Sequence, residues 1–72
     1  MTTTKIYPRN VKQGDRMLTT NGMREVLSVT RHPGLTEIAI EDVAVLTGRT
    51  TLRLFDYRRV KLTVERAQKA GV

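Results

Sequence analysis

Two glycine-containing turns near the start of the chain constrain its fold more than any other feature. Residues 11–16 read Val-Lys-Gln-Gly-Asp-Arg, and Asn21-Gly22 follows after a short run at residues 16–20. A Gly-Asp turn lets the backbone reverse where most side chains would clash, and Asn-Gly is the strongest short-range hairpin signal because both residues accept positive φ. The sequence therefore predicts a hairpin with strands at residues 16–20 and 23–30, which forms the entry to a small closed β-structure.

Alternation of apolar and polar residues organises most of the chain that follows. After a break at Pro33-Gly34, residues 35–41 place Ile38 and Ile40 on one face, which we expect to line the core. Further strands are predicted at residues 43–46, 49–55 and 60–64, the first two joined as a hairpin. Five or six short strands with such turns are typical of an all-β barrel or sandwich.

The two ends of the chain lie outside this pattern. Residues 1–8 are predicted to be a flexible lead-in, with the packing of Ile6 and Tyr7 as an edge strand as the alternative. Residues 65–72 contain good helix formers but are too few for a stable isolated helix, so a short helical or frayed tail is predicted there. The β-domain is expected to occupy residues 9–64.

Composition limits what can stabilise this chain. A chain of 72 residues buries only about 60% of the surface that its unfolded form exposes. It contains no cysteine, so neither a disulfide nor a thiolate zinc site can supplement the core. Residues 1–5 lack the apolar stretch of a signal peptide, and the longest aliphatic run is the four residues 43–46. These features predict a cytoplasmic protein with no membrane segment, stabilised by apolar packing or by a partner subunit.

The first hairpin also carries a family resemblance. The pattern Val-Lys-Gln-Gly-Asp-Arg-Met-Leu at residues 11–18, followed by Gly22, Val26 and Val29, resembles the entry of KOW-type SH3-like barrels, which occur in ribosome- and transcription-associated proteins. The turn at residues 56–59 adds to this likeness, because SH3-like barrels usually carry a single helical turn just before the final strand. The resemblance implies an SH3-like barrel of about five strands.

Two further likenesses concern function. The same spacing is similar to the fold of self-splicing inteins and hedgehog-type domains, whose chemistry needs a Cys or Ser nucleophile and a junction Asn. This chain begins Met1-Thr2, contains no Cys and ends Gly71-Val72, so we expect no splicing activity. A compact Gly-Asp hairpin with a basic terminal strand also resembles small proteins of bacteria and their phages, a likeness that implies no activity.

No arrangement of residues indicates catalysis or a metal site. The one histidine, His32, sits in the turn with Pro33 and is expected to be solvated. Glu41 and Asp42 supply too few oxygen ligands for a calcium loop. The glycines are isolated from one another and form no phosphate-binding loop. The sequence predicts a non-enzymatic protein without a metal or a cofactor.

The charge balance points to an anionic partner. Thirteen Lys and Arg against seven Asp and Glu give a formal net charge of +6, which favours polyanions and also serves solubility. If residues 49–55 pair with residues 60–64, one outer face collects most of the basic side chains of this region. The predicted contacts to a nucleic-acid phosphate backbone are Arg49, Arg53, Arg58, Arg59 and Lys61.

Other partners remain alternatives. The basic face can pair with Glu37 and Glu41 of the same chain, guard an edge strand, or meet an acidic protein surface. Phe55 and Tyr57 are predicted to form a protein interface, either with another protein or with a second copy of the chain in a homodimer. Because three aromatic residues are few for base stacking or for a proline-rich groove, contact with duplex or structured nucleic acid is the preferred mode.

Overall fold

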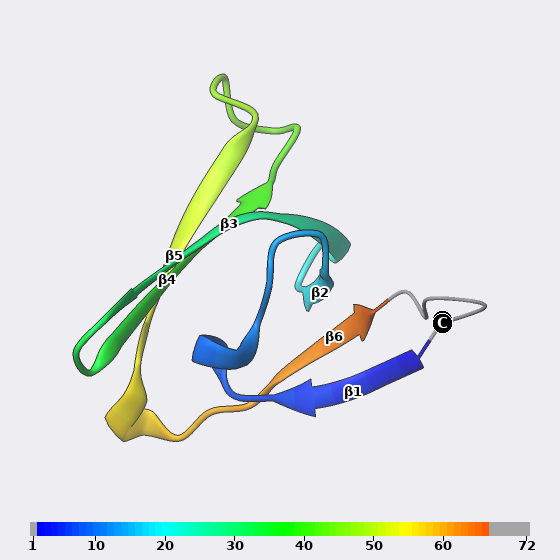
Figure 1. The fold of residues 1–72 in the computed structure, drawn as a ribbon. Coiled ribbons are helices and arrows are strands. Elements are labelled where there is room, and N and C mark those ends of the chain that lie inside the picture. Colours follow the sequence, from blue (N-terminus) through cyan, green and yellow to red (C-terminus); the bar gives the residue numbers. More distant parts are fainter. Residues whose placement is uncertain (1, 67–72) are drawn as a thin grey trace.

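Strands make up most of this chain in the computed structural model, which describes residues 2–66 (Figure 1). The only helical segments in that range are two short 3₁₀ turns. The elements in order are β1 (Thr2–Ile6), η1 (Pro8–Asn10), β2 (Arg16–Thr19), β3 (Gly22–His32), β4 (Leu35–Glu41), β5 (Arg49–Phe55), η2 (Asp56–Arg58) and β6 (Leu62–Arg66). The all-β prediction is confirmed, and the helical turn expected at residues 56–59 is present as η2.

Both predicted hairpins form, but the first turn lies one residue earlier than the predicted Asn21-Gly22 pair. Thr19 pairs with Gly22, so Thr20 and Asn21 make a two-residue connection between β2 and β3. Only Gly22 of the Asn-Gly pair has positive φ, at 94°. At the next hairpin Gly34 has φ 75°, the conformation required at the third position of a type II turn after Pro33.

The segment at residues 43–46 is not a strand, contrary to the prediction. Asp42 organises it as a loop: its side chain accepts hydrogen bonds from the Ala44 N–H at 3.0 Å and from the Thr50 hydroxyl at 2.7 Å. The Asp42 N–H in turn donates to the Gly48 carbonyl at 2.8 Å. A carboxylate that caps nearby backbone groups offers the chain an alternative to the strand ladder, so the apolar run becomes an exposed loop.

The strands form one antiparallel sheet in the order β1-β6-β2-β3-β4-β5. Strand β5 pairs only with β4 among the described strands, and β6 lies between β1 and β2. The predicted pairing of residues 49–55 with residues 60–64 is therefore wrong. The sheet is not closed between its edge strands β1 and β5, and it is thus not the closed structure predicted from the first hairpin.

The two chain ends also differ from the sequence prediction. Residues Thr2–Ile6 were predicted to be a flexible lead-in, but they form edge strand β1. Only the alternative prediction, an edge strand at Ile6 and Tyr7, anticipated a strand in this segment. Glu65 and Arg66, placed in a helical tail, extend strand β6 and pair with β1. The remaining residues of that tail, 67–72, lie outside the described part. Strand pairing overrides the helix propensity of Glu65 and Arg66, because Glu65 pairs with both β1 and β2 and Arg66 pairs with β1, whereas an isolated helical turn is unstable.

The sheet bends over a small core. A register shift between Val26 and Ser28 divides β3, whose first part pairs with β2 and whose second part pairs with β4. Such a bulge bends a strand and increases its twist. As a result, residues from both halves of the sheet meet in one buried cluster: Val11, Met17, Val26, Ile38, Ile40 and Val64. The prediction that Ile38 and Ile40 line the core is confirmed.

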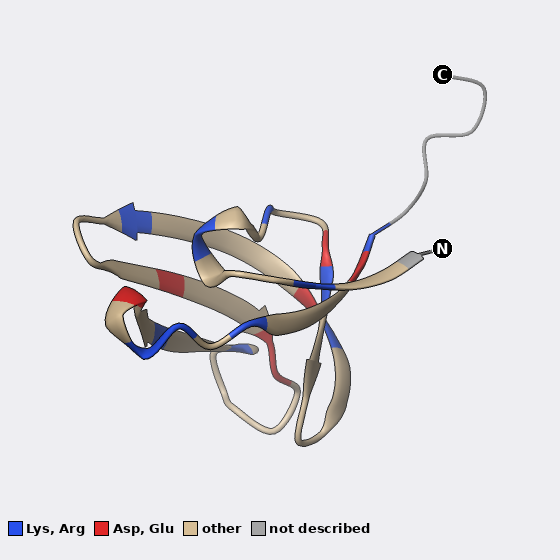
Figure 2. Ribbon diagram, turned by 90° about the horizontal axis from the view of Figure 1, so that it is seen from below, with Lys and Arg blue, Asp and Glu red and all other residues tan. Residues whose placement is uncertain are grey.

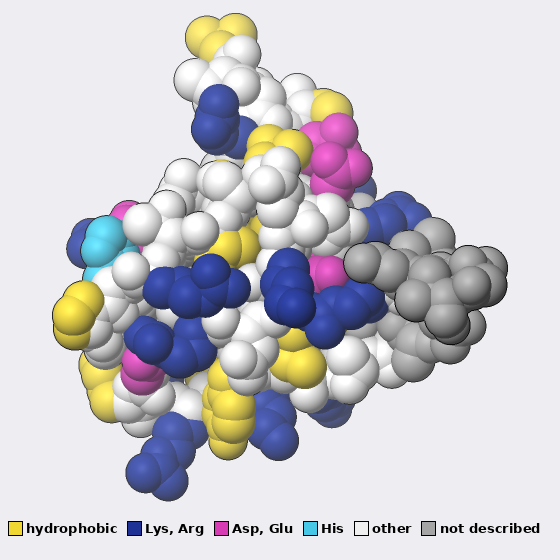
Figure 3. Space-filling view, viewed as in Figure 1, with side chains coloured by type: hydrophobic (Ala, Val, Ile, Leu, Met, Phe, Trp, Pro, Cys, Tyr) yellow, Lys and Arg dark blue, Asp and Glu magenta, His cyan; other side chains and the backbone are white. Residues whose placement is uncertain are grey.

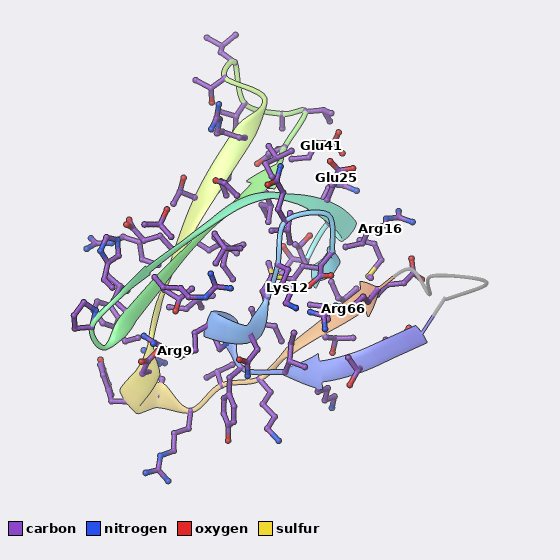
Figure 4. All side chains as sticks on the ribbon, viewed as in Figure 1. Arg9, Lys12, Arg16, Glu25, Glu41 and Arg66 are labelled. Carbon is purple, nitrogen blue, oxygen red and sulfur yellow. The ribbon has the colours of Figure 1, made fainter. Side chains whose placement is uncertain are left out.

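An internal ion pair ties the Gly14-Asp15 turn to the last strand. The Arg66 guanidinium donates two hydrogen bonds to the Asp15 carboxylate, at 2.9 and 2.7 Å, and Figure 4 shows Arg66 reaching from β6 toward the segment that carries Lys12. The Lys12 N–H donates a third, at 2.9 Å. Asp15 is only 4% exposed. The arginine therefore holds the pKa of Asp15 below its usual range, despite the opposing effect of burial.

Candidate nucleic-acid interface

The chain turns sharply between β5 and β6, and this turn exposes a set of large side chains. After Phe55 the backbone enters η2, anchored where the Asp56 N–H donates to the Gly34 carbonyl at 2.9 Å. Arg59 then takes a left-handed conformation with φ 50°, and its N–H donates to the Asp56 carbonyl at 3.1 Å. This conformation ends the turn and directs residues 60–61 toward β6. The protruding turn leaves its side chains in solvent.

Three basic side chains project from this turn. Arg58, Arg59 and Lys61 are exposed, and none of them forms an ion pair with another residue of the described part. Figure 2 shows Lys and Arg positions running from η2 into the connection to β6. A concentration of unpaired positive charge in four successive residues gives this turn a local positive potential.

Most other arginines of the described part are held by the protein itself. Arg9 binds Asp56 at 2.9 Å and the His32 carbonyl at 2.8 Å. Arg31 donates to the carbonyls of Arg9 and Val11, at 2.7 and 3.0 Å. Together with the Arg66 pair, these bonds tie η1 and the segment after it to β3 and β6. Such side chains stabilise the fold, whereas no described carboxylate pairs with the three cations at the turn.

Three aromatic rings lie in the same region. Phe55 and Tyr57 are 42% and 76% exposed, with ring centroids 5.7 Å apart and planes inclined by 38°. Tyr7, which is 43% exposed, arrives from the other end of the sequence, and the Lys61 ammonium lies 5.1 Å from its ring centroid. We call Tyr7, Pro8, Phe55, Tyr57, Arg58, Arg59, Val60 and Lys61 the η2 corner. Figure 3 shows basic and hydrophobic side chains side by side along this lower edge of the molecule.

Two shallow grooves cross the η2 corner and share Pro8, Phe55 and Val60. The first, of about 340 Å³, runs between Tyr7 and Phe55, with Arg59 on its border. The second, also about 340 Å³, lies between Arg53 and Arg58. The one carboxylate lining these grooves, Asp56, is neutralised by Arg9. The grooves thus combine apolar walls with positive rims.

The structure divides the basic residues that the sequence placed on one face. Arg58, Arg59 and Lys61 lie together, but Arg53 is paired with Glu37 at 3.6 Å, which is one of the alternatives that the sequence left open. Arg49 begins β5, opposite Glu41 and six residues before Phe55, so about 20 Å of extended chain separates it from the corner. The single basic face predicted from the β5–β6 pairing therefore does not form.

Tyr7 is the site residue that sequence reasoning did not assign. Its position depends on the pairing of β1 with β6, where Ile6 lies opposite Leu62. The alternative of an edge strand at Ile6 and Tyr7 was the available signal, but nothing in the sequence indicates which strand it joins. The predicted partners Phe55 and Tyr57 are adjacent, as expected from their spacing.

The other polar clusters are structural. His32 pairs with Glu37, Nε2 to Oε1 at 2.7 Å, rather than standing free in its turn. Asp42 is occupied by the loop that it caps, and these hydrogen bonds, first that from Thr50, lower its pKa. Within residues 2–66, no three His, Asp or Glu side chains are grouped so that they could hold a metal ion.

A larger hollow of about 590 Å³ opens toward the start of β5. It is lined by Met17, Leu18, Thr19, Thr20, Asn21, Arg24, Ile40, Glu41, Asp42, Thr50, Leu52 and Leu62. Its one arginine stands beside two carboxylates, so this hollow offers a polyanion no positive surface. No helical segment of the described residues is long and apolar enough to cross a bilayer.

Comparisons of the chain with protein-family models, with curated proteins and with solved structures found no match. The candidate interface is therefore inferred from the geometry of this chain.

Proposed function

We propose that this protein is a non-enzymatic binding module that contacts the phosphate backbone of a nucleic acid through the η2 corner. The observation that carries the proposal is the gathering of three exposed, unpaired cations beside exposed aromatic rings. Lysine and arginine bind phosphates by releasing condensed counterions, a contribution that requires no particular base sequence. A surface of this kind suits a polyanion better than a small neutral ligand.

We also propose that residues 9–64 are an SH3-like barrel left open at one side. Five strands in the order β6-β2-β3-β4-β5 and the helical turn before β6 support this proposal. The buried cluster shared by β2, β4 and β6 supports it as well, because it requires the sheet to curl.

Salt dependence tests the proposed function. If Arg58, Arg59 and Lys61 contact phosphates, the logarithm of affinity for a labelled duplex should fall with the logarithm of salt at a slope of about 0.9 per contact, or about 0.7 for a single strand. The variant with all three replaced by Gln should lose most of this slope. The measurement is fluorescence anisotropy at several salt concentrations.

A matched variant separates the corner from net charge. Replacement of Lys12, Arg24 and Arg49 by Gln removes the same number of charges at exposed or half-exposed positions away from the corner. This variant should keep the slope and most of the affinity. Equal losses in both variants, or no binding at low salt, would contradict the proposed function.

Arg59 allows a test in which folding and binding change in opposite directions. The left-handed conformation of Arg59 costs an L-residue about 1–2 kcal/mol, and glycine avoids this cost. Glycine also has the larger conformational entropy in the unfolded state, which offsets part of the gain in stability. Arg59→Gly is therefore expected to raise the free energy of unfolding by about 0.5 kcal/mol and yet weaken nucleic-acid binding. Denaturant unfolding and anisotropy on the same samples measure both. Unchanged affinity would remove Arg59 from the interface.

An acidic protein surface, including one on a second copy, is the second candidate partner. The exposed Phe55–Tyr57 pair favours it, because aromatic side chains are enriched at protein interfaces. Sedimentation over a range of concentrations separates this candidate: a homodimer would sediment at twice the 8.2 kDa of the chain.

A further inference from the structure

We propose that the η2 corner takes single-stranded rather than duplex nucleic acid, with unpaired bases stacked on the rings of Tyr57, Phe55 and Tyr7. This inference rests on the proposed function and specifies its substrate class. It also departs from the sequence prediction, which preferred duplex contact because aromatic residues are few. The fold changes that argument, since all three aromatic residues of the chain lie in this one corner.

The ring pair is arranged to accept a further ring. The Phe55–Tyr57 centroid distance of 5.7 Å lies within the range of favourable aromatic pairs, yet the 38° inclination leaves the two faces splayed. With 76% of Tyr57 exposed, most of its ring surface is available to solvent. Stacking on such rings is the usual way in which proteins hold unpaired bases.

The first groove extends this platform to Tyr7. Tyr7, Phe55 and Val60 are among the residues that line it, and its volume of about 340 Å³ lies in the range of small-molecule pockets. Lys61 lies over the Tyr7 ring, which holds a positive charge beside an aromatic surface. Arg59 lines the groove and Lys61 lies over the ring of Tyr7, so two cations are placed to attract the phosphate of a base bound there.

The distribution of charge also favours a single strand. Arg58, Arg59 and Lys61 lie within four residues, a track of about 10–14 Å even if fully extended. The predicted wider face, in which Arg49 and Arg53 extend the track along β5, does not form. Bases of a duplex are stacked on one another and cannot reach the exposed rings, so duplex binding would leave the aromatic part of the corner unused.

Affinities for a single strand and for the duplex of the same sequence test this inference. Full-length wild-type protein should bind the single strand more tightly. Tyr57→Leu and Phe55→Leu should each weaken single-strand binding by about 5- to 150-fold, which is the loss expected when one stacked base is no longer held. The matched variants Tyr57→Phe and Phe55→Tyr keep a ring and should keep most of the affinity. Both positions are solvent-accessible, and circular dichroism checks that the four variants fold.

Fluorescence gives a readout of stacking itself. The chain has two tyrosines and no tryptophan, so Tyr7→Phe leaves Tyr57 as the only tyrosine, and tyrosine fluorescence then reports on Tyr57 alone. The single strand should quench this signal, and the duplex should leave it unchanged at the same occupancy.

The outcomes separate the two proposals. Tight duplex binding that the leucine variants do not affect would overturn the single-strand inference and leave the phosphate-binding function intact. Absence of binding to either nucleic acid at low salt would overturn both. Equal losses in the leucine variants and in their ring-preserving counterparts would also overturn stacking, because the ring would then not be the feature recognised.

Discussion

Asp15→Asn is expected to lower the free energy of unfolding by about 2 kcal/mol, since it breaks charge-assisted hydrogen bonds to a buried carboxylate, while the Arg66 side chain, 40% exposed, can be hydrated again. The Asp15 carboxylate accepts three hydrogen bonds, two from Arg66 and one from the Lys12 backbone, while it is almost fully buried. An amide cannot accept the bidentate pair from Arg66, because one of its two oxygens becomes a donor nitrogen. Urea unfolding followed by circular dichroism measures the loss.

The Arg16–Glu65 pair is the matched control for this prediction. It joins β2 to β6 at 3.3 Å, but its Arg16 side chain is 48% exposed. Exposed pairs of this kind contribute less than about 1 kcal/mol, so Glu65→Gln should have little effect. The double variant of Asp15→Asn with Arg66→Met should cost less than the two single variants together, because each single change leaves an unpaired group. A loss for Asp15→Asn no larger than that for Glu65→Gln would contradict the structural role of Asp15.

The same pair predicts a pH dependence. The pKa of Asp15 is held below the ordinary value of 3.8, first by the hydrogen bonds from Arg66. A depressed pKa in the folded state stabilises the protein above the unfolded-state pKa, and this contribution is lost as the pH falls through the folded-state value. We therefore expect wild-type stability to fall below about pH 4 more steeply than that of Asp15→Asn. Parallel profiles would indicate that Asp15 does not titrate as the structure implies.

Thr36→Val is expected to raise the free energy of unfolding by about 1–2 kcal/mol, because it removes a buried hydroxyl that lacks a partner. Thr36 lies on β4, is fully buried, and its Oγ1 has no hydrogen-bond partner within the described part of the chain. Valine has nearly the same shape and favours strands, so the change should not disturb packing. Thermal unfolding of the purified variant measures the gain.

Thr50→Val is the control with the opposite sign. The Thr50 hydroxyl donates to Asp42 at 2.7 Å, and its loss frees the carboxylate that caps the loop at residues 43–48. This variant should destabilise the protein. Destabilisation by Thr36→Val as well would contradict the absence of a hydrogen-bond partner for Thr36 Oγ1.

Local pattern predicted much of the strand content. The bounds of β4 and β5 agree with the alternation in residues 35–41 and 49–55, the turn at Gly34 lies where expected, and the first hairpin turn lies within one residue of its predicted position. These features depend on neighbours in sequence, since side-chain alternation and turn conformation are properties of a few consecutive residues. The run at residues 43–46 was misassigned for the same reason: its apolar residues suit a strand, while the loop is held by hydrogen bonds donated to the Asp42 carboxylate, which alternation does not register.

The candidate site was only partly predictable. Phe55, Tyr57 and the basic residues 58, 59 and 61 are close in sequence, and any turn there exposes them together. Tyr7 joins them through the β1–β6 pairing, whose partners are separated by most of the chain. Arg49 lies away from the η2 corner and Arg53 is paired with Glu37 because β5 pairs with β4 rather than with β6.

By itself, then, the sequence determined an all-β chain, most of its strands and turns, the inward face of β4 and an excess of positive charge. The neighbours of each strand depend on the tertiary structure, and so does the division between arginines bound within the fold and those without an ion pair in the described part, at the η2 corner. The physical reason is that a strand's alternation specifies which face is buried but not which strand it pairs with. Pairing is decided by the shared core, where Met17, Ile38 and Val64 from three different strands must be buried together.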